Sequence, residues 1–170
     1  LETHAHADHL SSAQYLKRLF PSAQIAIGKN ITEVQDSFNL ILGLSCEFHT
    51  NGAHFDRLLV DNEVFSAGAL TIRVLYTPGH TPACVSYYVN REAVFTGDAL
   101  FMPDSGTGRC DFPRGSASQL YDSITNRLYT LPDDILVFVG HDYPPEDREL
   151  RFCSTVGEQK RENKHLCQDT

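Results

Sequence analysis

The spacing of apolar residues along the chain switches between the period of a helix and the period of a strand. Apolar residues four positions apart, such as Leu120, Ile124 and Leu128, predict helices. Apolar positions that alternate with more polar ones, as over residues 70–76, predict strands. Residues 43–62 fit neither period. Because helical and strand periods occur in turn along the rest of the chain, the chain is predicted to have a mixed α/β fold. The predicted helices cover residues 11–20, 31–41, 120–131 and 155–163, and the predicted strands cover residues 24–27, 70–76, 84–89, 93–96 and 135–139.

Capping and turn residues mark where several of these elements begin or end. Asn30 with Glu33, and Thr155 with Glu158, have the spacing of a capping box, so each pair is expected to begin a helix. Residues 90–92 form a short polar connection between two predicted strands, which indicates a β-hairpin.

Three predicted strands are followed by a short loop that begins with or contains a residue able to ligate a metal. His80, Asp98 and His141 each follow a glycine at such a strand end, and residues 4–9 hold a fourth group of histidines and an aspartate. Because loops at strand ends present side chains on a rigid scaffold, we expect these four segments to meet at one edge. The expected architecture is two packed sheets covered by helices.

Composition and charge favour one domain that acts on a small substrate. The 170 residues are 41% hydrophobic and 21% charged, which fits a single domain over residues 1–170. The formal charge of -8 argues against nucleic acid or an anionic membrane as a partner. The sequence opens without methionine, within three residues of its densest group of candidate ligands. We therefore expect an N-terminal truncation, which would hide upstream strands or a targeting peptide.

The cysteines are odd in number, widely scattered and never arranged as C-x-x-C. This usage is typical of reduced thiols in a cytosolic or organellar compartment. Each is expected to be a small buried hydrophobic residue or an inert surface thiol rather than a nucleophile. They are Cys46, Cys84, Cys110, Cys153 and Cys167.

The segment from His4 to His9 concentrates side chains that ligate metals. In extended backbone the residues at i and i+2 project to one side, so His4, His6 and Asp8 are expected to face one point and His9 a neighbouring one. Imidazole and carboxylate ligands suit zinc, iron or manganese, and the absence of paired cysteines argues against a closed structural zinc site. The segment therefore predicts an open catalytic metal site. The remaining histidines, His49, His54 and His165, are expected to be ordinary solvated or packed side chains.

Four motifs together resemble the metallo-β-lactamase superfamily: H-x-H-x-D-H at 4–9, P-G-H-T at 78–81, G-D-A at 97–99 and G-H at 140–141. The resemblance implies an αββα sandwich with two adjacent metal positions at its edge. The family normally has several strands before the first motif, which this sequence hardly supplies, in keeping with the expected truncation. By resemblance, His4, His6 and His80 serve one metal position, Asp8, His9 and His141 serve the other, and Asp98 bridges them.

Within the superfamily, most of the chain resembles persulfide dioxygenases of the bacterial kind. The stretches that carry this resemblance are 3–9, 77–89, 95–124, 140–145 and 154–163, and the Arg-x-Asp-Phe element at 109–112 is the most discriminating. The resemblance implies one Fe(II) held by His4, His80 and Asp98, a triad that leaves coordination positions open. The implied partners are glutathione persulfide and O2, and the implied products are sulfite and glutathione. The remaining ligands, His6, Asp8, His9 and His141, would form an unfilled second position or orient the first ligands.

Three further residues are candidates for the substrate pocket. Arg109 would grip a carboxylate of glutathione through its fork of donors, and Asp111 would hold the guanidinium in place. Tyr143, two residues after His141, would reach the same pocket with its hydroxyl.

Two alternatives stay open at this point. The same ligands suit a dimetal hydrolase with two Zn(II), similar to glyoxalase II, which would cleave a thioester or lactone with a bridging hydroxide. The glutathione-binding helical domain of glyoxalase II is not in this sequence. The other alternative is a domain that only binds a ligand. The expected location is the bacterial cytoplasm, or the mitochondrion if a targeting peptide precedes Leu1, and a homodimer is compatible with either enzyme.

Overall fold

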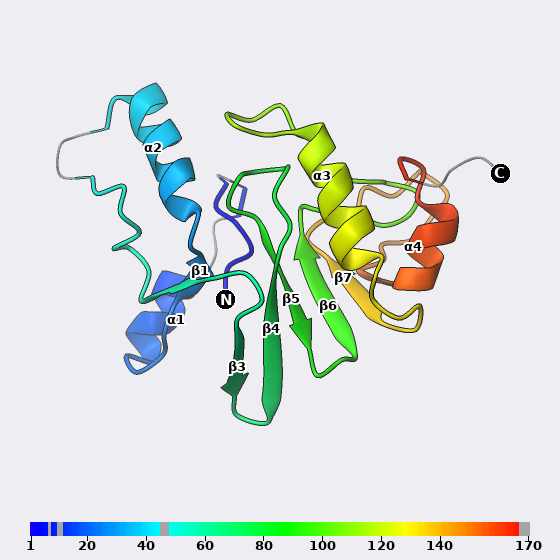
Figure 1. Cartoon of the computed structure of the whole chain (residues 1–170), viewed down its shortest axis with the longest axis horizontal. Coiled ribbons are helices and arrows are strands. Elements are labelled where there is room, and N and C mark those ends of the chain that lie inside the picture. Colours follow the sequence, from blue (N-terminus) through cyan, green and yellow to red (C-terminus); the bar gives the residue numbers. More distant parts are fainter. Residues whose placement is uncertain (7, 10–11, 45–47, 167–170) are drawn as a thin grey trace.

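The computed structural model describes residues 1–6, 8, 9, 12–44 and 48–166 (Figure 1). Cys46, Cys167 and the first residue of the predicted helix 11–20 lie outside the described residues. Within that part of the chain, none of the helices has the length and apolar character needed to cross a membrane. The elements are α1 (Ala13–Leu19), β1 (Ala26–Gly28), α2 (Ile31–Leu42), β2 (Arg57–Leu59), β3 (Val64–Ala67), β4 (Leu70–Tyr76), β5 (Val85–Val89), β6 (Ala93–Gly97), α3 (Ala117–Ser123), a π-helical segment η1 (Ile124–Leu128), β7 (Leu136–Val139), β8 (Cys153–Thr155) and α4 (Val156–Glu162).

The described strands form a large sheet and a small one. The large sheet has the order β3-β4-β5-β6-β7-β8, and in the small sheet β1 pairs with β2 in parallel. Strands β6 and β7 are parallel, while the other neighbours in the large sheet are antiparallel. Strands β4, β6 and β7 therefore run in the same direction. The loops that follow them, which carry His80, Asp98 and His141, leave the sheet at one edge.

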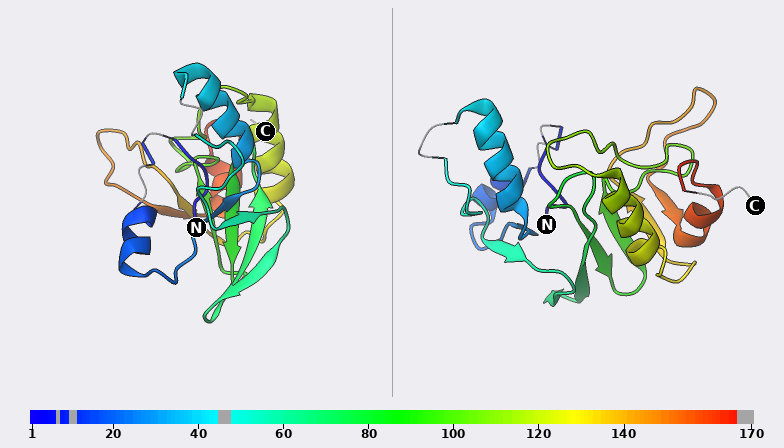
Figure 2. Two further views of the ribbon diagram at one scale, coloured as in Figure 1. Left: turned by 90° about the vertical axis from the view of Figure 1, so that its left-hand side faces the viewer. Right: turned by 45° about the horizontal axis from the view of Figure 1, so that its top comes forward.

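Helices α3 and α4 cover one face of the large sheet (Figures 1 and 2). Leu120 and Ile124, on α3 and η1, pack with Val156 of α4 against Val94 of β6 and Val137 of β7. These side chains are almost fully buried, and removing such apolar area from water is the main source of stability in a fold of this size.

The small sheet covers part of the opposite face, and α2 packs on the small sheet in turn. Ala26 of β1 and Leu59 of β2 pack against Val74 and Tyr87 of the large sheet. The next residue of β1, Ile27, points to the other side and contacts Ile31 and Val34 of α2 in a separate cluster. The order of layers is α3 and α4, large sheet, small sheet and α2, which confirms the αββα sandwich.

Most predicted elements are present, with shifted ends. The predicted cap at Thr155 is confirmed, since its hydroxyl accepts a hydrogen bond from the Glu158 backbone N–H at 3.1 Å. The helix predicted to begin at Asn30 does so, with Asn30 as the N-cap residue of α2, but the side chain makes no capping hydrogen bond and donates instead to the Pro82 carbonyl at 3.4 Å. The sequence patterns also missed the short strands β2, β3 and β8.

Candidate metal centre

The first residues of the chain reach the site because they dock between the two sheets. The Glu2 N–H donates to the Ala26 carbonyl of β1 at 2.9 Å, and the Thr3 carbonyl accepts from the Val85 N–H of β5 at 3.0 Å. His4 follows directly and is buried. This docking needs a glycine nearby, since a Cβ on Gly97, whose φ is +52°, would lie 2.4 Å from the Thr3 hydroxyl oxygen.

The structure brings all seven predicted metal ligands together at the expected edge, in two groups. The first ligand group is His4, His6 and His80, and the second ligand group is Asp8, His9, Asp98 and His141. Within each group, one ligand atom from each residue lies within 4.8 Å of the others. The expectation that Asp8 faces the same point as His4 and His6 is wrong. The backbone turns there, with the His9 N–H donating to the His6 carbonyl at 3.1 Å, and this turn directs Asp8 to the second group.

Asp98 lies between the two groups. Its Oδ2 is 3.5 Å from His80 Nε2 and 3.9 Å from His4 Nε2. The same oxygen is 3.5 Å from His141 Nε2, and the other oxygen, Oδ1, is 3.3 Å from His9 Nε2. The carboxylate therefore faces ligands of both groups, which is the position that a bridging ligand requires.

The innermost ligands carry polar atoms that nothing in the described chain satisfies. His4, His80 and Asp98 are 2%, 3% and 6% exposed. His4 Nε2 and Asp98 Oδ1 are buried without a hydrogen-bond partner, because the nearby His9 Nε2 lies outside hydrogen-bonding geometry toward that oxygen. Leaving such atoms unpaired costs roughly 1–3 kcal/mol each. A cation bound by these atoms would remove that cost, so the donor set fits a metal ion.

Burial keeps two histidines of the first ligand group, His4 and His6, neutral. Burial, reinforced by the neighbouring imidazole of His9, lowers the pKa of His4 to about 2. Burial and the imidazole of His80 lower the pKa of His6 to about 4. Both imidazoles are therefore unprotonated at neutral pH, and each keeps a lone pair for a metal.

The outer nitrogens of two ligands are held by hydrogen bonds. His80 Nδ1–H donates to the Arg109 carbonyl at 2.6 Å, which leaves the Nε2 lone pair facing the site. His4 Nδ1 lies 3.1 Å from the Thr3 hydroxyl. Partners of this kind orient metal-binding histidines and raise their basicity.

A cavity of about 660 Å³ opens beside the ligands and includes the predicted pocket residues Arg109 and Tyr143 in its lining. Arg109 Nε is 3.3 Å from Asp111 Oδ1, as predicted, but both side chains are mostly exposed and Asp111 does not line the cavity. The Tyr143 ring stacks on His141 with its centroid 5.6 Å away.

Phe112 is a pocket residue that residue-by-residue reasoning missed, although it closes the Arg-x-Asp-Phe element. Its ring lies under the Arg109 guanidinium at 4.3 Å and against the His6 ring at a centroid distance of 3.9 Å. The Phe112 ring therefore lies between the Arg109 guanidinium and the first ligand group. The α2 residue Phe38 also lines the cavity, and no local signal separated it from an ordinary packed residue.

Arg148, which the sequence analysis also missed, ties together two loops of the cavity. Its guanidinium donates to the carboxylate of Asp142, next to His141, and to that of Asp104. The Arg148 hydrogen bond lowers the pKa of Asp142. The clamp therefore fixes the loop of His141 and Tyr143 against the loop of Ser105, whose hydroxyl donates to the Tyr143 carbonyl at 3.2 Å.

The other histidines and the described cysteines stand outside this chemistry, as expected. Within the described residues, His49, His54 and His165 join neither ligand group. His165 Nδ1 instead accepts from the Thr107 N–H at 3.1 Å. Burial raises the pKa of Cys84 to about 12 and also raises the pKa values of Cys110 and Cys153, so these thiols are poor nucleophiles at neutral pH.

A sequence profile of the metallo-beta-lactamase superfamily matches residues 1–141. The chain therefore belongs to the metallo-β-lactamase superfamily, which the motifs, the sandwich and the ligand groups independently indicated. A crystal structure of ETHE1 from Myxococcus xanthus superposes with a TM-score of 0.74 at 36% identity, over 96% of this chain and 60% of that one.

Curated relatives carry names of different activities. Glyoxylase B2 of Dictyostelium discoideum is 52% identical over 98% of this chain, and a probable metallo-hydrolase of Burkholderia pseudomallei is 47% identical over 98%. The human mitochondrial persulfide dioxygenase ETHE1 is 33% identical over 84% of this chain. The chain spans 56%, 59% and 48% of the lengths of these three proteins. The comparisons thus place the chain among oxidoreductase-named and hydrolase-named members alike.

Proposed function

We propose that this chain carries the active site of a mononuclear non-haem iron dioxygenase that oxidises glutathione persulfide to sulfite and glutathione. In this reaction O2 and one water supply the oxygens of sulfite, the sulfur–sulfur bond breaks, and glutathione leaves as its thiol. The partners are then glutathione persulfide and O2. We place the enzyme in the bacterial cytoplasm, with the mitochondrion as the alternative.

The observation that carries the proposal is the difference in burial among the ligands. The most buried ligands, His4, His80 and Asp98, are two histidines and one carboxylate, whereas Asp8 is exposed and His9 and His141 are partly exposed. Two histidines and one carboxylate with open positions are the ligand set of non-haem Fe(II) oxygenases. Iron(II) bound there would supply the activation of O2.

The cavity beside these ligands suits a peptide thiol with carboxylates. Arg109 offers a planar fork of donors that matches a carboxylate, and the Phe112 ring and Asp111 hold its guanidinium. Phe38, Phe101 and Phe112 form apolar walls of the cavity, which would reduce the amount of water around a bound persulfide. A glutathione persulfide bound in this cavity would have its sulfur held close to the metal ligands, which would lower the entropic part of the activation barrier of the oxidation.

A dimetal hydrolase with two Zn(II) is the second candidate, and two observations favour it. The ligand atoms of the second group lie within 4.8 Å of one another, as a second metal position requires. Relatives at 52% and 47% identity are named glyoxylase B2 and probable metallo-hydrolase. In this candidate a hydroxide between the ions would attack a thioester or lactone, and Asp98 would bridge the ions.

The discriminating experiment measures iron and zinc content, O2 uptake with glutathione persulfide, and thioester hydrolysis in the same preparations. We expect about one iron per chain and O2 uptake for the wild type. His4→Ala and His80→Ala should lose both, because each removes one of three protein ligands. His141→Ala should keep its iron and lose about 10- to 100-fold in activity, as is typical for residues that orient ligands.

His54→Ala is the matched control, because His54 contacts Gln35 at 3.2 Å and belongs to neither ligand group. It should leave metal content and O2 uptake unchanged. The proposal gives way to the hydrolase if the wild type consumes no O2 with glutathione persulfide, binds two zinc ions, and loses one of them in His141→Ala.

A further inference from the structure

A cavity of about 740 Å³ lies at the end of the large sheet opposite the metal centre. It is lined by the first residues of β4 and by the turn between β5 and β6, including Thr71, Arg73 and Asn90. Strands β4 and β6 run from this end of the sheet toward His80 and Asp98. The cavity, here called the distal cavity, is therefore separate from the site described above.

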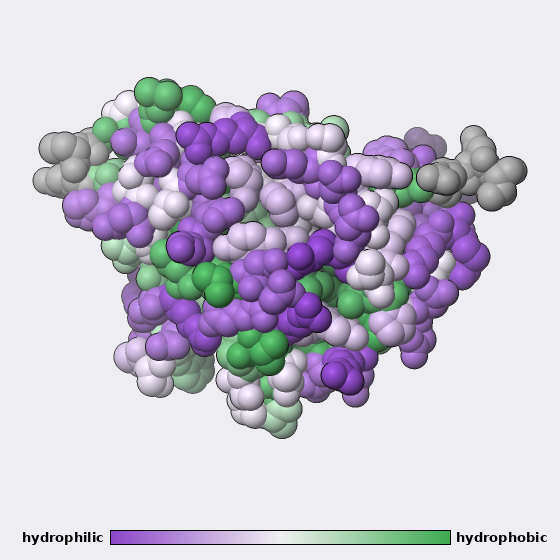
Figure 3. Space-filling view, in the orientation of Figure 1, coloured by the Kyte–Doolittle hydropathy of each residue, from purple (hydrophilic) through white to green (hydrophobic). Residues whose placement is uncertain are grey.

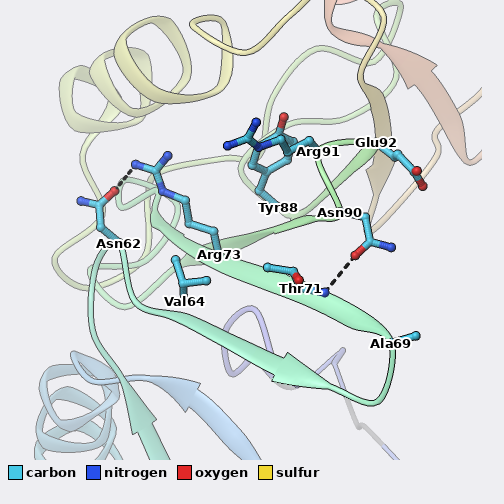
Figure 4. A pocket seen from close by; sticks show the side chains of 9 residues that line it. All are labelled: Asn62, Val64, Ala69, Thr71, Arg73, Tyr88, Asn90, Arg91 and Glu92. Carbon is cyan, nitrogen blue, oxygen red and sulfur yellow. Dashed lines mark hydrogen bonds between the residues drawn. The ribbon is translucent and has the colours of Figure 1, made fainter.

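Cations and an aromatic ring share one face of the sheet in the distal cavity. Arg73 of β4 is the cross-strand partner of Tyr88 of β5, so both side chains project from the same face. Figure 4 shows the guanidinium groups of Arg73 and Arg91 on the side of the strands where the Tyr88 ring stands. The Asn90 amide oxygen accepts from the Thr71 N–H at 2.8 Å, which leaves its NH2 group as a donor for a ligand.

Unlike most arginines of this acidic protein, the two arginines of the distal cavity have no ion-pair partner among the described residues. Within the described residues, neither Arg73 nor Arg91 forms an ion pair, and Arg73 donates only to the uncharged Asn62 amide, at 2.5 Å. Glu92 is the carboxylate of the lining, so the lining keeps a net positive charge. Arginines that do form ion pairs are Arg57, Arg109, Arg114, Arg127, Arg148, Arg151 and Arg161.

Arg91 also has a left-handed backbone conformation, which favours glycine or asparagine over arginine. It has a φ of +60° and follows Asn90, with a φ of +53°, in a turn closed by a hydrogen bond from Glu92 N–H to the Val89 carbonyl at 3.0 Å. Glycine or asparagine is preferred at such positions, because a longer side chain crowds the backbone. An arginine here lowers the stability of the turn, and its guanidinium faces the distal cavity.

We propose that the distal cavity binds a small phosphate monoester, with its phosphate held by Arg73 and Arg91. Two guanidinium forks match the oxygens of a dianionic phosphate, and each supplies charge-assisted hydrogen bonds. The volume falls in the range of small-molecule sites and exceeds what a phosphate ion fills, so room remains for the esterified group.

The test is calorimetric titration of the metal-loaded protein with ribose 5-phosphate and, separately, with inorganic phosphate. We expect ribose 5-phosphate to bind more tightly, because inorganic phosphate leaves most of the cavity unfilled. Arg73→Gln and Arg91→Gly should each weaken binding of ribose 5-phosphate about 10-fold or more, since each removes a charge-assisted contact. Arg91→Gly should at the same time keep or raise the melting temperature, because glycine relieves the positive φ.

Arg114→Gly is the matched control, because Arg114 has a φ of +62° but pairs with Glu33 at 3.2 Å and lines neither cavity. It should leave binding of ribose 5-phosphate unchanged. Arg109→Ala should also leave it unchanged, because Arg109 lines the cavity beside the metal ligands and not the distal cavity. The proposal is overturned if ribose 5-phosphate does not bind the wild type or binds no better than inorganic phosphate. It is also overturned if Arg73→Gln and Arg91→Gly keep full affinity, or if Arg109→Ala alone abolishes binding.

Discussion

Replacing Gly140 with alanine would move Asp98 without changing any metal ligand. Gly140 lies between the end of β7 and His141, and an ideal Cβ there would lie 2.6 Å from Asp98 Oδ1. The φ of Gly140 is not in the left-handed region, so alanine fits the backbone. The perturbation is therefore steric and acts mainly on the carboxylate that faces both ligand groups, with a lesser crowding of the Gly97 backbone, whose carbonyl carbon would lie 3.1 Å away.

The size of the effect follows from that distance. Ordinary contacts of a Cβ begin at 3.4 Å, so the carboxylate must retreat by about 0.8 Å. Metal–ligand distances tolerate deviations of only about 0.2 Å. Asp98 cannot yield by that amount and still ligate, because it is buried against His80 and His141. We expect Gly140→Ala to lower metal affinity by at least the roughly 10- to 100-fold seen when ligand-orienting residues are lost.

The assay is metal content by elemental analysis after dialysis, with the melting temperature measured in parallel. Gly157→Ala in α4 is the control, since its Cβ would meet the Asp133 side chain at 3.0 Å, away from the metal centre. Asp98→Asn, which keeps the shape of the side chain, should lose metal with the fold intact. A folded Gly140→Ala protein with wild-type metal content would refute the assignment of Asp98 as a ligand.

Three further changes test other parts of the structure. Arg109→Ala should raise KM for glutathione persulfide roughly 10-fold or more, because the variant loses the proposed contact between the guanidinium and a substrate carboxylate. The loss of stability should be small, because the exposed ion pair with Asp111 is worth less than about 1 kcal/mol. Arg114→Ala should leave KM unchanged, and an unchanged KM in Arg109→Ala would remove Arg109 from the pocket. Gln159→Leu should lower the free energy of unfolding by roughly 2–4 kcal/mol in urea titrations. The reason is that the buried Gln159 amide donates to the Phe101 carbonyl at 2.7 Å and to the Ser154 hydroxyl at 2.9 Å. A loss below about 0.5 kcal/mol, the usual size for a surface change, would contradict this. Burial raises the pKa of Asp61, but hydrogen bonds from Arg127 and the Tyr76 N–H outweigh it and leave the pKa below its ordinary value. The stabilising contribution of the Asp61 carboxylate is therefore present at neutral pH and is lost as pH falls through its folded-state pKa. Asp61→Asn should be less stable than wild type by about 1 kcal/mol at pH 7, and the difference should shrink below about pH 4. A difference that does not depend on pH would contradict the ion pair between Asp61 and Arg127.

Much of the fold was predictable because its signals are local. The alternation over 70–76 and the helical spacing of Leu120, Ile124 and Leu128 depend on residues a few positions apart, and both elements are present. The cap at Thr155 is likewise a contact with a residue three positions away. Asn30 also begins its helix as predicted, but its amide donates to a loop from another part of the chain, a contact that local spacing does not reveal.

The short strands were not predictable for a related reason. Strands β2 and β8 contain only Arg57–Leu59 and Cys153–Thr155, too few residues to show a period. Each is a strand because a neighbour pairs with it, β1 in one case and β7 in the other. Pairing between distant segments is a property of the folded chain, so no window of sequence contains it.

The sequence by itself singled out the candidate metal ligands of this protein, because histidines and carboxylates are common metal ligands and their spacing in 4–9 is a local property. Only the tertiary structure decided how they are shared. The turn after His6 separates Asp8 from the first ligand group, and the parallel course of β4, β6 and β7 brings His80, Asp98 and His141 to one edge. The structure alone also placed Phe112 between Arg109 and His6, since a contact between rings more than 100 residues apart depends on packing and leaves no period in the sequence.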